Sequence, residues 1–410
     1  MGQAYQVVLS YFVGDSSLNV IFPNGICLTN TANSEKLSTV RARPVRPFEP
    51  RKSLMKCIMK LAAAAVAAVG LISGATAAEK LKVGFVYVGP IGDHGYSYQH
   101  EQGRLALQKA LGDKIETTFL ENVPENDSER SIEQLARAGH KLIFTTSFGF
   151  MEPTLRVARK YPNLRFEHAT GYKRSDNVAT YSARFYEGRY VQGVIAGQVT
   201  KTNTVGYIAA YPIPEVIGGI NAFYLGAKSV NPNIKIKIVW ANTWYDPGKE
   251  SEAAKALLAQ GADILAQHTD SAAPMQEAEK AGKFAFGQAS DMIKFGPKAQ
   301  LTATTNNWAG YYIERTQLAL DGKWKTGDVW GGIGAKMIIM APFTNMPADV
   351  KAMAEKTVAD IGSGALLPFA CPVLDQTGKT VECKGGKGLS DEQILSMNWY
   401  VQGIEDKVPQ

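Results

Sequence analysis

Cysteine and histidine are scarce in this chain, with four and five among 410 residues. His94, His100 and His168 are scattered, without the spacing of metal ligands. The dinucleotide, P-loop and nucleophile-elbow motifs are also missing, and the nearest pattern, 89–95, carries Pro90 where a pyrophosphate needs free N–H groups. We therefore expect neither a cofactor nor a metal, and an enzyme is the weaker interpretation.

The chain also lacks a strong excess of charge. Its net charge is +6, but the first 78 residues hold eight Lys and Arg against three Asp and Glu. The remainder carries 36 basic and 35 acidic residues, which is close to neutral. This balance argues against a nucleic-acid partner and against direct binding to an anionic membrane surface.

No apolar run is long enough to span a bilayer, which needs roughly 20 residues. The uncharged run 61–72 follows a short basic lead, and Ala75-Thr76-Ala77 has the small residues that signal peptidase reads. We therefore predict a signal peptide at 55–78, cleaved near Ala77 or Ala78, and a periplasmic protein. Cys57 precedes the apolar run, so it is not a lipid-anchored first residue.

Residues 1–54 show no sustained helical or alternating period and end in an Arg/Pro-rich stretch. Because an export signal leads the nascent chain, we interpret them as the result of a start codon placed too early. The alternative is a disordered cytoplasmic extension before an uncleaved anchor. Either way they are set apart from the fold.

Past the signal, only Cys371 and Cys383 remain. Two apolar arms around 376–379 indicate a hairpin, which would bring the thiols together. In an exported protein a disulfide is the natural interpretation. A metal pair is the weaker alternative, because no His lies nearby in the sequence.

Buried strands alternate with helices along the rest of the chain, first through 82–185 and again through 204–287. Such alternation predicts parallel sheets with helical crossovers. We predict an α/β protein of two doubly wound, Rossmann-like lobes joined by a hinge. The first lobe is expected at 79–200 with about 306–332 returning to it, and the second at 201–305 with part of 333–410.

Ligands bind such sheets beyond the carboxyl ends of the strands, and here aromatic and neutral hydrogen-bonding side chains dominate these segments. That mixture suits an uncharged planar ring held by stacking. Candidate ligand-binding residues are Tyr96, Ser147, Phe148, Thr170, Gly171, Trp244, Gln288, Asp291 and Asn306.

These residues also have purely structural interpretations. Aromatic rings at strand ends often cap a core, Asp291 could cap a following helix, and Asp246 before Pro247 resembles a helix start. Export, two similar lobes and an aromatic cleft nevertheless favour a periplasmic solute receptor whose closed form is read by a permease.

Several segments carry a family resemblance that covers roughly 82–400. They are 92–96, 185–193, 226–232, 243–247, 261–263 and 290–291. In this order the chain resembles the basic membrane protein family of substrate-binding proteins, the purine nucleoside receptor A-like group. The resemblance implies the type I periplasmic-binding-protein fold, a small-molecule ligand, and an ABC permease with its ATPase as partners.

The family holds a purine between two aromatic rings, which by position resemble Tyr96 and Trp244. Its acidic pair is reduced here to Asp291, with Ala289 at the inner position, and a family Lys falls at or near Trp308. Another family acid is replaced by Thr170. Because the family uses some of these charges on ribose hydroxyls, their loss favours a free base, most simply adenine, over a nucleoside.

Five alternatives remain open at this point. The ligand could be a purine nucleoside or another small ring compound, or the fold could serve a sugar. The chain could be an exported nucleoside hydrolase using Asp93 and Asp291. It could also present its ligand to a membrane sensor.

Overall fold

The computed structural model describes residues 19–21, 27–29 and 79–409. The predicted signal peptide and its cleavage site lie outside these residues. The chain forms two compact units, Met1–Ala75 and Thr76–Gln410. In the first unit β1 (Asn19–Ile21) pairs with antiparallel β2 (Cys27–Thr29), where the sequence had shown no alternating period.

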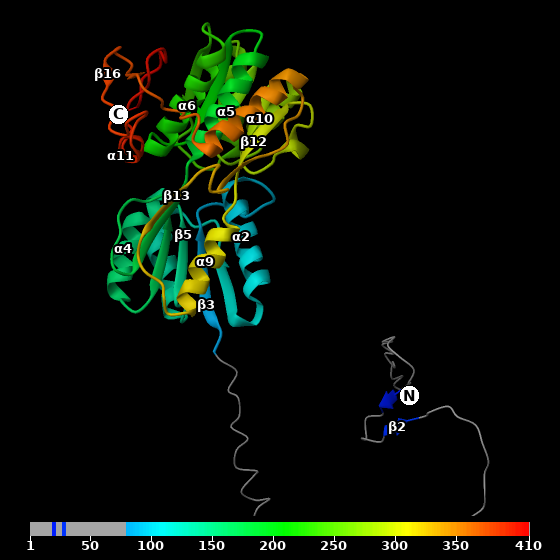
Figure 1. The fold of residues 1–410 in the computed structure, drawn as a ribbon, viewed down its shortest axis with the longest axis vertical. Helices are drawn as coiled ribbons and strands as arrows, with labels where there is room; N and C mark the ends of the chain where they lie inside the picture. Colours follow the sequence, from blue (N-terminus) through cyan, green and yellow to red (C-terminus); the bar gives the residue numbers. More distant parts are fainter. Residues whose placement is uncertain (1–18, 22–26, 30–78, 410) are drawn as a thin grey trace, which may run out of the picture. The chain divides into compact units, whose positions relative to one another are not determined.

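The first lobe is a six-stranded parallel sheet in the order β13-β7-β6-β5-β3-β4 (Figure 1). Its strands are β3 (Leu81–Tyr87), β4 (Ile115–Leu120), β5 (Leu142–Thr146), β6 (Arg165–Ala169), β7 (Val178–Ala183) and β13 (Asp328–Gly331). Its helices are α2 (Gly95–Leu111), α3 (Ser128–Arg137), α4 (Met151–Lys160) and α9 (Ala309–Leu320). Separate apolar cores join α2 with α9 and α3 with α4, so the sheet is covered on both faces.

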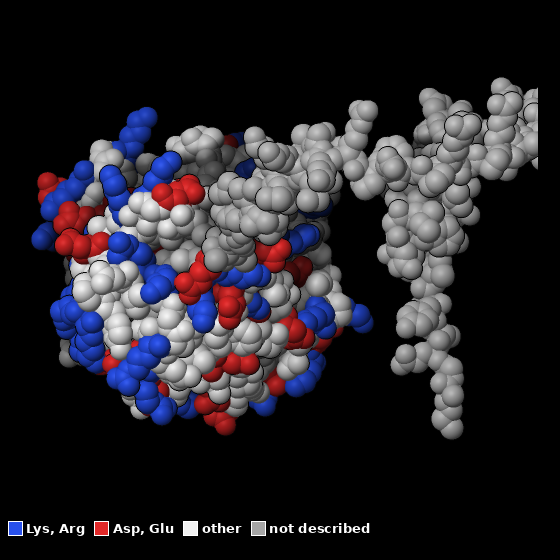
Figure 2. Space-filling view, turned by 90° about the horizontal axis from the view of Figure 1, so that it is seen from below, with Lys and Arg blue, Asp and Glu red and all other residues white. Residues whose placement is uncertain are grey.

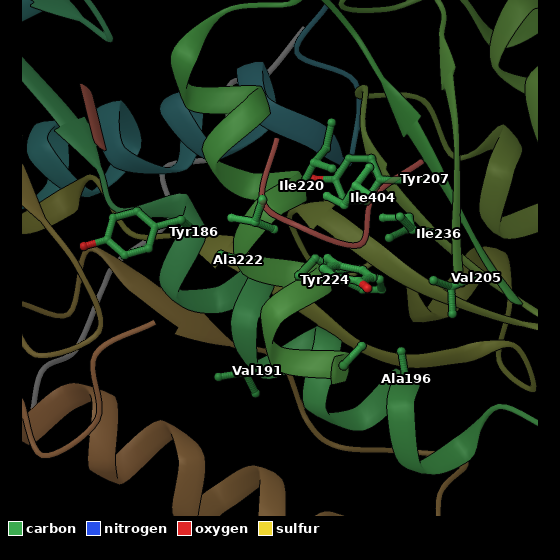
Figure 3. Close-up of a cluster of buried hydrophobic side chains, with 14 of the residues drawn as sticks. Tyr186, Val191, Ala196, Val205, Tyr207, Ile220, Ala222, Tyr224, Ile236 and Ile404 are labelled. Atoms are coloured by element: carbon green, nitrogen blue, oxygen red, sulfur yellow. The ribbon is translucent and has the colours of Figure 1, made fainter. Parts of the chain in front are cut away.

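The second lobe has the sheet order β14-β12-β11-β10-β8-β9, in which only β14 is antiparallel to its neighbour. Its strands are β8 (Thr204–Ala209), β9 (Lys235–Trp240), β10 (Ile264–His268), β11 (Phe284–Ala289), β12 (Gln300–Asn306) and β14 (Ile338–Met340). Its helices are α5 (Phe185–Val199), α6 (Pro214–Val230), α7 (Pro247–Ala259), α8 (Ala273–Lys280) and α10 (Ala348–Ser363). Figure 3 shows side chains of β8, β9 and α6 packed into its main core.

The chain crosses between the lobes three times. It passes from β7 into α5 at Arg184, from β12 into α9 at 307–308, and from β13 into β14 at 332–337. Backbone hydrogen bonds join these segments: Arg184 N–H donates to the Gly331 carbonyl over 2.8 Å, and Asn307 N–H to the Met337 carbonyl over 3.0 Å. These three segments form the hinge.

The sequence had placed the first crossing near residue 200, but α5 already packs against α6 and α10 of the second lobe. The approach of α5 to α6 is close, because a Cβ at Gly193 would lie 2.0 Å from the Phe223 carbonyl oxygen. Strand–helix alternation does not tell which sheet a helix covers, and the boundary therefore differs from the expected one by the length of α5.

The last fifty residues pack on the second lobe, where Phe369, Met397 and Tyr400 join its main core. A short hairpin of β15 (Val373–Leu374) and β16 (Thr380–Val381) brings Cys371 and Cys383 together. They form a disulfide with 6.4 Å between the Cα atoms, which confirms the prediction from the sequence. Helix α11 (Asp391–Leu395) follows.

The prediction of two doubly wound α/β lobes is thus confirmed. Among residues 79–409, none of the helices is both long and apolar enough for a bilayer crossing. On the face seen in Figure 2, basic and acidic side chains are interspersed rather than gathered by sign, as the near-neutral charge balance suggests.

Candidate ligand-binding cleft

A cavity lies between the carboxyl ends of the two sheets. The location is the one that open α/β sheets favour for a ligand. Its wall consists of Val88, Tyr96, Ser147, Phe148, Thr170, Phe185, Glu215, Trp244, His268, Asp270 and Gln288.

Most of the residues chosen from the sequence lie in this wall: Tyr96, Ser147, Phe148, Thr170, Trp244 and Gln288. Gly171 lies in a groove that adjoins the cavity. Thr170 has φ of 66°, a left-handed conformation that is uncommon for a β-branched residue. Strained backbone of this kind is concentrated at ligand sites.

Asp291 and Asn306 lie outside the cavity wall. The Asp291 carboxylate accepts hydrogen bonds from Ile293 N–H (3.0 Å) and from the Gln300 side-chain amide (2.7 Å). It thus stabilises the turn that follows β11, in line with its structural interpretation. Asn306 ends β12 and is 3% exposed, buried beside the hinge.

The two rings expected to stack on a ligand come from opposite lobes. Tyr96 sits in the first turn of α2, where its ring meets His100 edge-on, with 4.3 Å between centroids. Trp244 follows β9, and its indole N–H donates to Glu125 Oε1 of the other lobe over 3.2 Å. Phe148 and Phe185 add two more aromatic walls.

Two carboxyl groups in the cavity wall were missed from the sequence. Glu215 is the second residue of α6, where the helix dipole favours a negative charge. Its Oε1 lies 3.4 Å from His268 Nε2, and burial lowers the pKa of that imidazole. The only sequence signal for Glu215 was the Pro-Glu pair after β8. It was not recognised, because such a pair also begins ordinary helices.

The second missed acid is Asp270. Burial, and then the neighbouring Glu250 and Glu215, raise its pKa to about 8, although the Tyr96 N–H opposes this shift. At neutral pH Asp270 is therefore protonated and can donate a hydrogen bond. The cleft is less neutral in composition than the sequence predicted, because acids from separate loops converge in it.

The nearest cation lies behind the wall rather than in it. Arg189 is fully buried on α5 and donates hydrogen bonds to the side-chain oxygens of Gln192 (3.0 Å) and Gln288. Its charge therefore orients the Gln288 carboxamide, whose amide end remains for a ligand.

The lobes touch each other around the cavity. Gly95 N–H donates to Ser290 Oγ over 2.7 Å, and Lys294 forms an ion pair with Asp93. Gly95 has φ of 86°, and a Cβ there would lie 2.8 Å from the Asp270 carbonyl oxygen. Glycine is thus required where α2 begins against the second lobe.

The acids considered for a hydrolase are not gathered in the cavity. Asp93 is an exposed partner of Lys294, Asp291 stabilises a turn, and neither lines the wall. Among residues 79–409 no three His, Cys, Asp or Glu side chains form a metal-binding group.

Comparison with known proteins places this geometry in context. A family profile described as ABC transporter substrate-binding protein PnrA-like matches residues 80–361. A purine-binding protein of Brucella abortus is 58% identical, over 85% of this chain and 99% of that protein. A putative ABC transporter glucose-binding protein of Haloferax volcanii, TsgA13, is 37% identical over 82% of this chain and 83% of its own length.

Solved structures agree on the fold. An ABC transporter solute-binding protein from Aeropyrum pernix superposes with a TM-score of 0.61 at 19% identity, covering 71% of this chain and 94% of that one. One from Conexibacter woesei gives 0.56 at 22% identity, covering 70% and 98%. The predicted type I periplasmic-binding-protein fold is therefore confirmed.

Proposed function

Because the chain belongs to the PnrA-like family of ABC transporter substrate-binding proteins, we propose that it captures a purine between its lobes and delivers it to a membrane permease. Proteins of this family bind solutes rather than convert them. The name of the Brucella abortus relative supports a purine ligand, since that protein shares 58% of its residues with this chain.

The observation that carries this proposal is the composition of the cavity wall. Tyr96 and Trp244 face the cavity from opposite lobes, so a planar ring between them would join the lobes. Stacking of this kind suits a purine, which is flat and has polar groups only along its edge. The edge would meet the carboxyls of Glu215 and Asp270 and the carboxamide of Gln288.

We propose adenine as the ligand, in preference to its nucleoside. Adenine has an exocyclic amine and a ring N–H, which can donate to Glu215, while the Gln288 amide N–H and neutral Asp270 can donate to ring nitrogens. A nucleoside lacks that ring N–H, because the sugar replaces it. Asp291, the acid that remains of the family's pair, is engaged in a turn outside the cavity wall.

The partners follow from the same proposal. The receptor would act in the periplasm after removal of residues 55–78, and an ABC permease with its ATPase would recognise the closed form. Ligand that bridges both lobes stabilises this form by its differential affinity for it.

Calorimetric titration of the mature protein with adenine, adenosine and glucose tests the proposal. We expect adenine to bind at least tenfold more tightly than adenosine, and glucose to give no measurable heat. Tenfold tighter binding of adenosine would reverse the choice of ligand. Binding of glucose alone would replace the purine with a sugar, the ligand in the name of the Haloferax volcanii relative.

A further inference from the structure

A groove adjoins the cavity between the lobes. The two share Phe148, Thr170, Phe185 and Glu215 in their walls, so they are continuous. A ligand seated in the cavity would therefore have one edge open to the groove. The purine proposed above does not need this space.

The groove is walled mainly by apolar side chains. Ile213 and Pro214 come from the start of α6, Trp330 from β13, and Ile394 and Leu395 from α11. Leu395 is 44% exposed and lines the groove, so its side chain is accessible there. Helix α11 lies beyond residue 361, where the match to the family profile ends.

Two of the polar side chains of the groove, Arg174 and Trp330, are paired within it or with the backbone. Arg174 contacts Asp328 at 3.4 Å, and the Trp330 indole N–H donates to the Ala183 carbonyl over 3.2 Å. Of the described residues that line the groove, none has a buried polar side-chain atom without a partner. The groove therefore presents mainly apolar surface, and no unpaired buried polar atom in it requires a charged ligand.

Helix α11 is held at the hinge by an ion pair. Arg184 donates to both carboxylate oxygens of Asp391, the first residue of α11, with 2.8 Å between Nη1 and Oδ1. The same guanidinium lies 4.2 Å from the centroid of the Trp330 ring. The groove wall is thus fixed in position on both sides.

We propose that this groove is a second subsite, which accepts an apolar substituent on the purine ring. The inference rests on the proposed function. It extends the ligand class from adenine to purines that carry a hydrophobic or aromatic side group. Burial of such a group against Leu395 and Trp330 would contribute through the hydrophobic effect.

Calorimetry with adenine and with its N6- and 8-benzyl derivatives, which keep the ring N–H, tests the subsite. We expect at least one derivative to bind wild-type protein within tenfold of adenine. Leu395→Trp, which fills the groove, should weaken that derivative at least tenfold and adenine less than twofold. Leu367→Trp is the matched control, since Leu367 is 39% exposed in the same C-terminal segment but outside the groove.

Two results would overturn the subsite while leaving the purine receptor intact. One is binding of adenine with every derivative more than a hundredfold weaker. The other is equal weakening of adenine and derivative by Leu395→Trp. Failure of the proposed function is distinct, because wild-type protein would then bind neither adenine nor any derivative.

Discussion

Trp244 contributes the largest ring in the cavity wall, and it reaches across to Glu125 of the first lobe. Its removal deletes one stacking surface and the burial that accompanies it. We predict that Trp244→Ala weakens adenine binding by about 1–3 kcal/mol, or roughly 5- to 150-fold, by calorimetry. Tyr245→Ala is the control, since this neighbouring ring is 39% exposed and outside the wall. An affinity unchanged in Trp244→Ala would remove the indole from the site.

Asp270 makes stability depend on pH in a direction that can be measured. Its pKa rises from 3.8 to about 8 on folding, so the native state keeps a proton that the unfolded state loses in this window. Its contribution to the free energy of unfolding therefore falls as pH rises from about 4 to about 8. Asn at this position does not titrate.

We predict that the stability of Asp270→Asn relative to wild type increases with pH, by up to about 1.4 kcal/mol per unit below pH 8, and is constant above it. Urea unfolding of both proteins at pH 5, 7 and 9 measures this difference. Glu215, His268 and Glu250 face Asp270 in both proteins, so their own titration largely cancels. A difference that does not change with pH would show that Asp270 is ionised in the folded protein.

Single residues of the site were predictable where a sequence rule places them. Trp244 and Ser147 follow strands of the two parallel sheets, and the carboxyl ends of parallel strands meet. Glu215 and Asp270 were not predictable. Nothing in the local sequence distinguishes an acid in the site, at a helix start or in a loop, from an acid exposed to solvent. Their role comes from burial against the other lobe, which only the folded chain reveals.

At the scale of elements, strands with continuous apolar runs were predicted well, and β8 and β9 have the expected ends. Strand β13 was missed, because its Asp-Val-Trp-Gly sequence has neither an apolar run nor a clear alternation. It forms only as the edge partner of β7. Sequence pattern thus predicts elements whose own side chains form the core. It does not predict elements that form only by pairing with a distant strand.

The C-terminal hairpin depends on its disulfide, which closes a short loop with a sequence separation of 12. Loss of the cross-link raises the conformational entropy of the unfolded chain. For a loop of this size, this favours unfolding by about 2–4 kcal/mol. We predict that Cys371→Ala with Cys383→Ala lowers the free energy of unfolding by this amount in urea. Wild-type protein with a reductant should fall to the same value. A change below about 0.5 kcal/mol would show that packing alone holds the hairpin.

At the scale of the whole molecule, the proposed function requires the lobes to close on the ligand. The Asp93–Lys294 ion pair joins them outside the cavity, and the Lys294 and His94 side chains lower the Asp93 pKa. Both partners are about half exposed, so water and salt screen the interaction.

We predict that Lys294→Ala weakens ligand binding by at most about 1 kcal/mol, and that the effect vanishes at high salt. The change in affinity is measured by calorimetry at low and high ionic strength. Lys298→Ala is the control, because Lys298 is an exposed neighbour without an ion pair. A larger loss that persists in salt would mean that Lys294 contacts the ligand or holds the fold.

The central claim is that a purine ring lies between Tyr96 and Trp244 and joins the two lobes. A crystal structure of the mature protein grown with adenine tests it directly. We expect the ring in contact with both side chains, its edge within hydrogen-bonding distance of Glu215, Asp270 or Gln288. Adenine bound elsewhere, or a cavity left empty at saturating adenine, would contradict the account.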